Sequence, residues 1–272
     1  MTINFNVEPY YDDYDEDKNF HRILFKPGVA IQARELTQLQ TILQKQIERV
    51  GKHLFKEGAV VIPGQVSIDL TVSSIKLQAT SLDLPTTFTN SNVIVTGATT
   101  GVEATVIKGI NAEGTDPATL VVRFTKTGSD NSTKVFANNE TLTITGIPTT
   151  VVAATTGAVN SSSIASIQDG VYYVLNNLVK VSSQVIVLDK YSATPSYRIG
   201  LAVSESFITE EDDSTLNDNA IGSYNENAPG AHRYQILLTL DKLDLSSTLD
   251  QDFIQLLEVV GGAVKKIVDK TD

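Results

Sequence analysis

The sequence contains no cysteine and no tryptophan, and only three histidines among its 272 residues. Without cysteine the chain has no disulfide, no thiolate nucleophile and no zinc site built on thiolates. His21, His53 and His232 are far apart along the chain and form no HExxH pattern, so we expect no metal and no cofactor. No run approaches the roughly 20 apolar residues that span a bilayer, and the N-terminus lacks the basic start and apolar stretch of a signal peptide. We therefore expect no membrane partner and no export.

Basic residues are also scarce, since 21 Lys and Arg face 32 Asp and Glu and give a net charge of −11. Nucleic-acid affinity comes mostly from neutralising phosphates with Lys and Arg, so no nucleic-acid partner is expected. The sequence has no GxxxxGK[ST] phosphate loop and no G-x-S-x-G nucleophile elbow. These absences predict that the chain is not an enzyme and has no catalytic residues. A glycan-degrading enzyme stays open as a remote alternative, because two carboxylates can meet in space from any positions.

An acidic stretch near the N-terminus begins like a calcium-binding loop. Asp13, Asp15 and Asp17 match the first three ligands of an EF-hand, but Lys18 stands where glycine is needed and Leu24 where a bidentate Glu should be. A looser calcium site here or in the acidic run 210–213 stays open, although solvated acidic loops are the default interpretation.

The strongest structural signal lies between residues 30 and 57, which are rich in helix formers. Apolar residues recur there at spacings of three and four, which places them on one stripe of a long helix. A polar glutamine occupies one position of this stripe. The predicted oligomer interface consists of Leu36, Leu39, Leu43, Gln46, Ile47, Val50 and Leu54.

This stripe must be buried, either against the chain's own β domains or against copies of itself. Burying a polar residue such as Gln46 costs less stability in a short bundle of several helices than in an isolated pair of helices. We expect a homo-oligomer, with packing inside the chain as the alternative.

The rest of the chain has the Thr-rich, turn-punctuated pattern of short strands. The sequence predicts a mainly β protein with one long N-terminal helix, an α+β fold with β-sandwich or barrel modules. A small β domain at 85–160 is predicted to be inserted into a parent β domain formed by 58–84 and 161–245. Residues 246–272 are predicted to form a short helix and a C-terminal segment.

Two stretches resemble a family of virion proteins from contractile-tailed bacteriophages, including phages of cyanobacteria, which is known as a conserved domain of unknown function. The first is residues 15–64, with the core KPGVAIQARELTQLQ. The second is residues 216–240, where Asp-Asn-Ala-x-Gly is followed by Asn-x-Pro-Gly-Ala-x-Arg. Together they cover about a third of the chain.

The resemblance implies a structural protein of the virion tail or baseplate, made in the host cytoplasm. It suggests an adaptor between baseplate and tail fibres that is a homotrimer, with its helices in a trimeric bundle and with other baseplate or tail-fibre proteins as partners. The alternative is a receptor-recognition tail protein that binds a host surface glycan through the Thr- and Asn-rich β module. That module has few aromatic side chains, which makes carbohydrate binding the less favoured of the two functions.

Residues 1–29 look like an extended arm rich in aromatic side chains. A segment of this kind is predicted to bury its aromatics against a neighbouring subunit, with packing on the chain's own helix as the alternative. The predicted docking residues are Tyr10, Tyr11, Tyr14, Phe20, Leu24 and Phe25.

Overall fold

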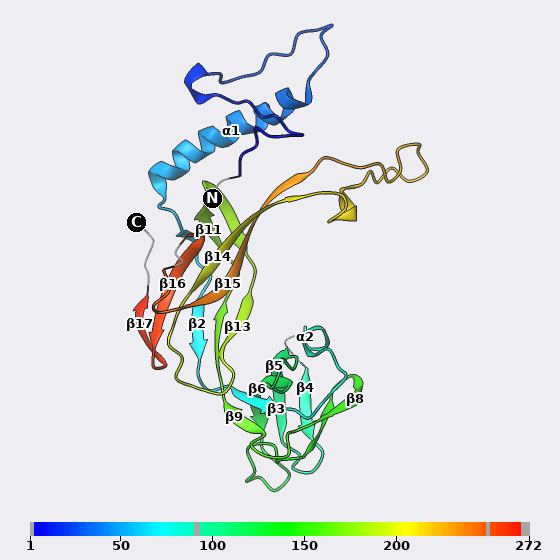
Figure 1. The fold of residues 1–272 in the computed structure, drawn as a ribbon, viewed down its shortest axis with the longest axis vertical. Helices are drawn as coiled ribbons and strands as arrows, with labels where there is room; N and C mark the ends of the chain where they lie inside the picture. Colours follow the sequence, from blue (N-terminus) through cyan, green and yellow to red (C-terminus); the bar gives the residue numbers. More distant parts are fainter. Residues whose placement is uncertain (1–2, 90–92, 249–250, 268–272) are drawn as a thin grey trace.

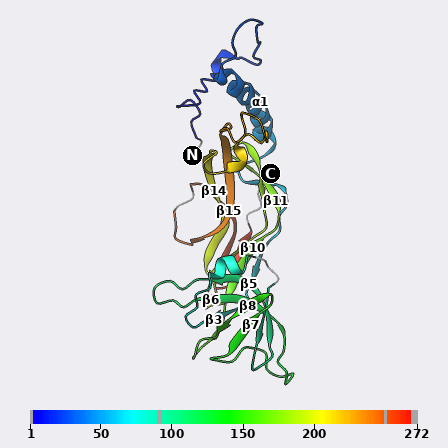
Figure 2. The same ribbon diagram turned by 90° about the vertical axis from the view of Figure 1, so that its right-hand side faces the viewer.

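The computed structural model describes residues 3–89, 93–248 and 251–267, which form an elongated molecule with three levels (Figures 1 and 2). The N-terminal arm and helix α1 lie at one end, a group of sheets forms the middle, and a separate seven-stranded sheet forms the other end. The fold is mainly β with one long N-terminal helix, so the predicted α+β class is confirmed.

Helix α1 spans Ala33–Leu54, three residues shorter at each end than predicted. It begins after Gln32, whose backbone is extended and whose N–H donates to the Glu35 carboxylate at 2.9 Å. It ends where the Phe55 N–H donates to the carbonyl of Gly51. Gly51 lies against the ring of Tyr173, and a Cβ at this position would be 2.7 Å from that ring. The glycine therefore lets the C-terminal turn of α1 approach the sheets closely.

The middle level is the parent unit, in which two three-stranded sheets and one four-stranded sheet share a core. The three-stranded sheets have the orders β1-β11-β12 and β13-β10-β2, and the four-stranded sheet has the order β15-β14-β16-β17. Their strands are β1 (Ala59–Ile62), β2 (Val66–Asp69), β10 (Ser163–Ile167), β11 (Gly170–Val174), β12 (Asn177–Val181), β13 (Gln184–Asp189), β14 (Tyr197–Ile208), β15 (Arg233–Asp244), β16 (Phe253–Val260) and β17 (Ala263–Ile267).

The two three-stranded sheets continue one another across a break at Pro63-Gly64. β1 and β2 pair with β11 and β10, which are themselves successive along the chain. A Cβ on Gly64 would lie 2.3 Å from the carbonyl oxygen of Gln168, so the two backbones meet there without room for a side chain.

The far end of the molecule is the inserted unit, a seven-stranded antiparallel sheet with the order β8-β7-β4-β5-β6-β3-β9. It curls around its core until Leu77, after β3, pairs with Ala153, after β8. A short helix, α2 (Leu84–Thr87), lies beside β5. The strands are β3 (Ser73–Lys76), β4 (Ile94–Gly97), β5 (Glu103–Ile110), β6 (Thr119–Lys126), β7 (Thr141–Ile144), β8 (Ile147–Val152) and β9 (Val159–Ser161).

The boundary of the inserted unit differs from the predicted 85–160. β3 was expected in the parent domain, but it pairs with β6 and β9 and belongs to the inserted sheet. Only three residues separate β2 from β3, and the composition of neither strand says which sheet it joins.

The predicted C-terminal helix is wrong. Residues 253–260 and 263–267 form β16 and β17, a hairpin that extends the sheet of the parent unit. Gly261 and Gly262 have φ values of 58° and 81°, the two positive angles that a tight hairpin turn requires. Part of the segment, residues 249–250 and 268–272, falls outside the described residues.

The two units are joined by a small apolar cluster and by polar bridges. Val72, Val121 and Ile164 are buried together where the chain passes between the units. Arg123 of β6 is 2.5 Å from Asp69 of β2, and the carboxylate of Asp116 accepts hydrogen bonds from Lys190 and Tyr191. These contacts fix the inserted unit at the end opposite α1 (Figure 1).

Candidate assembly interface

The apolar stripe of α1 is not covered by the rest of the chain. Its apolar members are Leu36, Leu39, Leu43, Ile47, Val50 and Leu54, and their exposed fractions run from 37 % for Leu39 to 63 % for Ile47. Gln46, on the same stripe, is also exposed. We call these seven residues the seam. In the chain by itself the sheets of the parent unit do not shield the seam, because α1 lies beyond them and meets them near its C-terminal turn (Figure 1).

Charge is segregated away from the seam. The seam contains no Lys, Arg, Asp or Glu, and the charged residues of α1 occupy its other faces. Glu48 is paired within the helix to Lys45 at 2.8 Å and to Lys52 at 2.5 Å. Burial alone would raise the pKa of the Glu48 carboxyl, but the hydrogen bonds from the two lysines outweigh it and the pKa is lowered.

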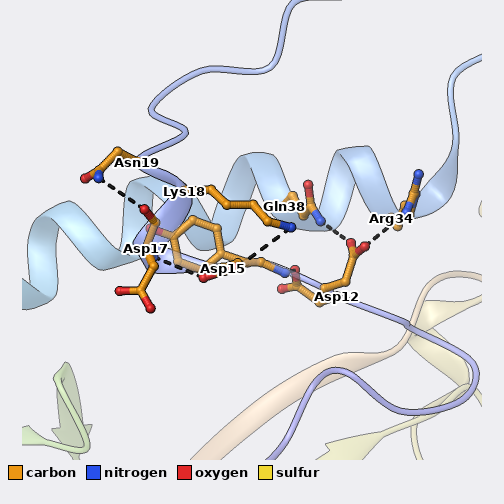
Figure 3. Close-up of polar contacts among 9 residues, drawn as sticks. Asp12, Asp15, Asp17, Lys18, Asn19, Arg34 and Gln38 are labelled. Carbon is orange, nitrogen blue, oxygen red and sulfur yellow. Dashed lines mark hydrogen bonds and ion pairs between the residues drawn. The ribbon is translucent and has the colours of Figure 1, made fainter.

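The acidic part of the arm covers the opposite face of α1 (Figure 3). The Thr41 hydroxyl donates to Asp12 at 2.5 Å, and Asp12 is buried. Asp13 accepts from Gln38 and lies 3.0 Å from Arg34. At 3.6 residues per turn these helix positions lie across the axis from the seam. The arm therefore protects the polar face of α1 and leaves the apolar face open.

An exposed ion pair fastens the arm near the other end of α1. Glu16, in the single turn η1 (Glu16–Lys18), is 2.5 Å from Arg49. The hydrogen bond from Arg49 lowers the pKa of the Glu16 carboxyl, and the same bond raises the pKa of Arg49. Two acids of the stretch considered as a calcium site, Asp13 and Glu16, bind cationic or amide side chains of α1 instead.

The first residues of the arm pack on the tips of β14 and β15. The ring of Phe5 lies edge-on to Phe207 and Tyr234, with centroids 5.8 and 5.0 Å away. Tyr10 packs on Phe207 with centroids 4.9 Å apart. Burial, together with a hydrogen bond to Glu205, raises the pKa of Tyr234. This aromatic cluster anchors the arm to its own chain.

His232 links the arm to the loop between β14 and β15. The hydroxyl of Tyr10 is 2.7 Å from His232 Nδ1, and His232 Nε2 is 3.3 Å from a buried carboxylate oxygen of Glu210. No local sequence pattern indicates this chain of contacts, because its three members are up to 222 residues apart. The one local signal is the turn sequence Pro229-Gly230, which ends two residues before His232 and favours a fixed position for its ring.

The six predicted docking residues divide into two groups. Tyr10 and Tyr14 are partly buried. Tyr10 packs on the strand tips of its own chain, neither against a neighbouring subunit as predicted nor on α1 as the alternative had it. The other four are exposed: Tyr11 55 %, Phe20 63 %, Leu24 78 % and Phe25 46 %. Three of these lie in the segment that leads from η1 to α1.

A cleft of about 850 Å³ opens between the arm, the start of α1 and the strand tips. Its apolar wall is formed by Phe5, Tyr10, Phe207, Tyr234 and Leu36. Leu36 also belongs to the seam, so cleft and seam form one continuous surface. Sequence reasoning missed the cleft, because its walls come from three distant parts of the chain.

The described parts of the chain show neither a metal site nor a membrane-spanning helix. Within residues 3–89, 93–248 and 251–267, no group of three or more His, Asp or Glu is placed to hold a metal ion. None of the helices in these ranges has the length and hydropathy needed to cross a membrane.

Comparison with known proteins gives one match. Residues 8–127 match the model of a family described as a domain of unknown function, DUF4815. The match runs through the acidic arm, α1 and the strands up to β6, which is less than half of the chain. No curated protein and no solved structure matches the chain. The matched family's description carries no function, so the function must be argued from the seam and the cleft.

Proposed function

We propose that the chain is a structural subunit of a tailed-phage virion, a baseplate or tail-fibre adaptor that works by self-assembly and by docking neighbouring subunits. The observation that carries this proposal is the exposed seam. Single-chain proteins in water rarely expose a contiguous row of large apolar side chains, and such rows mark interaction surfaces. The seam runs for about 27 Å between Leu36 and Leu54 at 1.5 Å per residue.

The seam suits a second and third copy of the same helix. Covering the exposed part of six large apolar side chains contributes on the order of 5–10 kcal/mol per copy before the entropy of association is subtracted. Three helices around one axis would also bring the Gln46 side chains together, where each amide can donate to its neighbour. The proposed assembly is therefore a parallel homotrimer.

The charge distribution favours the same assembly. Copies that each carry a net charge of −11 repel one another at long range. The seam itself adds no repulsion, because it has no charged residue, and two acids of the arm, Asp13 and Glu16, pair with Arg34 and Arg49 on the far side of α1. Association through this face thus buries apolar area without desolvating a charge.

The shape of the molecule fits an adaptor role. The seam lies at one end and the inserted unit at the other, with the parent unit between them (Figure 1). Trimerisation through α1 would leave three inserted units free to meet other tail components. Localisation in the virion tail or baseplate is part of this proposal.

The proposal is tested on particles. Mass spectrometry of purified virions and a side-chain-resolution map of the assembled tail should find this chain with its α1 helices packed seam to seam. A chain that is absent from the particle, or that is present with α1 exposed to solvent, would contradict the proposal.

A second candidate is carbohydrate recognition by the inserted unit. One observation favours it: an open cleft of about 570 Å³ lies beside α2, lined by Gln78, Thr80, Asp83 and Asn111 among others. These side chains offer hydrogen bonds of the kind that orient a sugar, but no aromatic ring lines the cleft. A glycan array with the whole chain tests this function. Reproducible binding that Thr115→Arg, at the rim of the cleft, abolishes would support it, and no binding would dismiss it.

A further inference from the structure

Two protruding segments at the α1 end of the molecule carry opposite charge. Residues 18–31, here the basic segment, include Lys18, Arg22 and Lys26 and no acid. Residues 209–232, here the acidic loop, join β14 to β15 and include no Lys or Arg. The acids of this loop are Glu210, Glu211, Asp212, Asp213, Asp218 and Glu226.

The basic segment has apolar side chains without a partner in its own chain. Leu24 is 78 % exposed, and Phe20, Phe25, Val29 and Ile31 are exposed as well. Within the described residues Arg22 and Lys26 form no ion pair, although both are exposed. The segment thus combines unsatisfied positive charge with uncovered apolar surface.

The acidic loop keeps its negative charge and borders the cleft. Asp212 accepts hydrogen bonds from the backbone N–H and the hydroxyl of Thr209, and Asp213 accepts them from the hydroxyl and the backbone N–H of Thr215. These bonds lower the pKa of both carboxyls. The last residues of the loop, from Gly230 to His232, line the cleft next to its aromatic wall. The lining contains no residue of the basic segment, so the chain does not fill its own cleft.

We infer that the cleft of one copy receives residues Phe20–Phe25 of a second copy, with Arg22 and Lys26 facing the acidic loop. The inference rests on the proposed function, because it requires two copies packed through their seams. Apolar side chains of the segment cover the aromatic wall, and the positive charges meet the exposed carboxylates of the acidic loop, such as Glu211. The cleft holds one opposing charge, Arg233, whose guanidinium is already bonded to the carbonyls of Ala231 and His232.

The position of both features on α1 supports a second copy as the occupant. The basic segment leads directly into the N-terminus of α1, and the cleft is lined by Ala33, Leu36, Thr37 and Gln40 in the first turns of the same helix. Parallel packing through the seam brings the two to the same level along the axis. Antiparallel packing would separate them by about 33 Å, the length of a 22-residue helix at 1.5 Å per residue. The docking therefore also predicts the parallel orientation.

A disulfide trap tests the docking in the whole chain, which has no native cysteine to interfere. Leu24→Cys and Ala231→Cys are combined in one variant, and a matched control combines Leu24→Cys with Lys134→Cys, an exposed site in the inserted unit. After mild oxidation, the first variant should run as covalent dimers and trimers on a non-reducing gel. The control should stay at the mass of one chain.

The outcomes separate this inference from the proposed function when the mass of the unoxidised variant is measured in parallel. A trimer that gives no interchain bond, or a bond closed within one chain, overturns the docking and leaves the trimer standing. A monomer at all concentrations overturns both.

Charge exchange tests the electrostatic part. Lys26→Glu should raise the dissociation constant of the assembly about tenfold at low salt, as for a close charge pair across an interface. Glu211→Lys alone should weaken assembly in the same way, and the two changes together should restore it. If the double variant loses as much association free energy as the two single variants together, the pairing is overturned.

Discussion

The inserted unit and the α1 end of the molecule use apolar residues in opposite ways. In the inserted unit Ile75, Leu120 and Leu142 are fully buried in a core made by residues 73–161 alone. On α1 the seam leucines are half exposed or nearly so. Both regions have the periodicity of an amphipathic element. This periodicity predicts that one face is buried, but it does not say whether the same chain or another molecule buries it.

This difference supports the proposed function. A region that completes its own core needs nothing more from outside, whereas a region that leaves a seam, a cleft and a basic segment uncovered is built for association. The seam, the cleft and the basic segment adjoin one another at the α1 end of the molecule. The comparison fails if the chain assembles without the seam, or if the stability of the inserted unit depends on assembly.

The largest effect is expected from Leu39→Asp combined with Leu43→Asp. Two charges in the middle of the seam should raise the dissociation constant of the trimer by at least about a thousandfold, or about 4 kcal/mol. Sedimentation velocity should show a folded monomer with unchanged circular dichroism. Leu178→Asp is the matched control, since Leu178 is similarly exposed on β12. An unchanged mass in the double variant would refute the role of the seam.

Leu142→Ala tests the core of the inserted unit. Truncating this buried residue of β7 leaves a cavity in the inserted core and should lower the free energy of unfolding by about 2–5 kcal/mol. Urea denaturation measures this loss, while the molar mass should stay that of the assembly. Leu178→Ala, at an exposed position, should change stability by less than about 0.5 kcal/mol. A loss of assembly in Leu142→Ala would mean that the two ends are not independent.

A smaller effect, dependent on pH, is expected from Glu140→Gln. The buried Glu140 carboxylate accepts N–H bonds from Thr99, Thr100 and Ala137. Burial raises its pKa, but these bonds outweigh burial and hold the pKa below 4.5. Because the folded-state pKa is depressed, the stabilisation is complete above the unfolded-state pKa and is lost as pH falls through the folded one.

At pH 7 the variant should therefore be less stable than the wild type by about 2 kcal/mol. Urea denaturation at pH 7 and pH 3 should show this difference shrinking at the lower pH, since glutamine does not titrate. A difference that stays the same at both pH values would contradict the assignment.

The smallest effect is expected from Tyr10→Phe, which removes the hydrogen bond to His232 and keeps the ring. Loss of about 1 kcal/mol in arm attachment should speed limited proteolysis of the arm about fivefold without changing the mass of the assembly. Tyr11→Phe is the control, because Tyr11 is exposed beside it. Equal cleavage rates in the two variants would show that the contact with His232 does not hold the arm.

Local pattern was enough to predict α1 and most of the strands. The leucine spacing of α1 and the alternation in β5 and β14 are set within single elements, where side-chain period follows backbone geometry. The C-terminal hairpin was missed because Phe253, Ile254, Leu256 and Leu257 fit a helical period as well as a strand over so few residues. The Gly261-Gly262 turn was the signal that could have decided the matter.

The candidate site was predictable in part. The seam residues follow from spacing alone, but whether the chain covers them depends on where α1 lies relative to the sheets. The contacts of Phe5 and Tyr10 with Phe207, Tyr234 and His232 join segments about 200 residues apart, and no local pattern encodes such pairings. For the same reason the cleft could not be foreseen, although the charges that border it are plain in the sequence.

The molar mass of the wild-type chain in solution tests the central claim most directly. Sedimentation equilibrium over a range of concentrations should give three times the chain mass of 29.4 kDa, because copies of α1 cover one another's seams. A mass of 29.4 kDa at every concentration would contradict the account, since the seam would then stay exposed in the functional molecule.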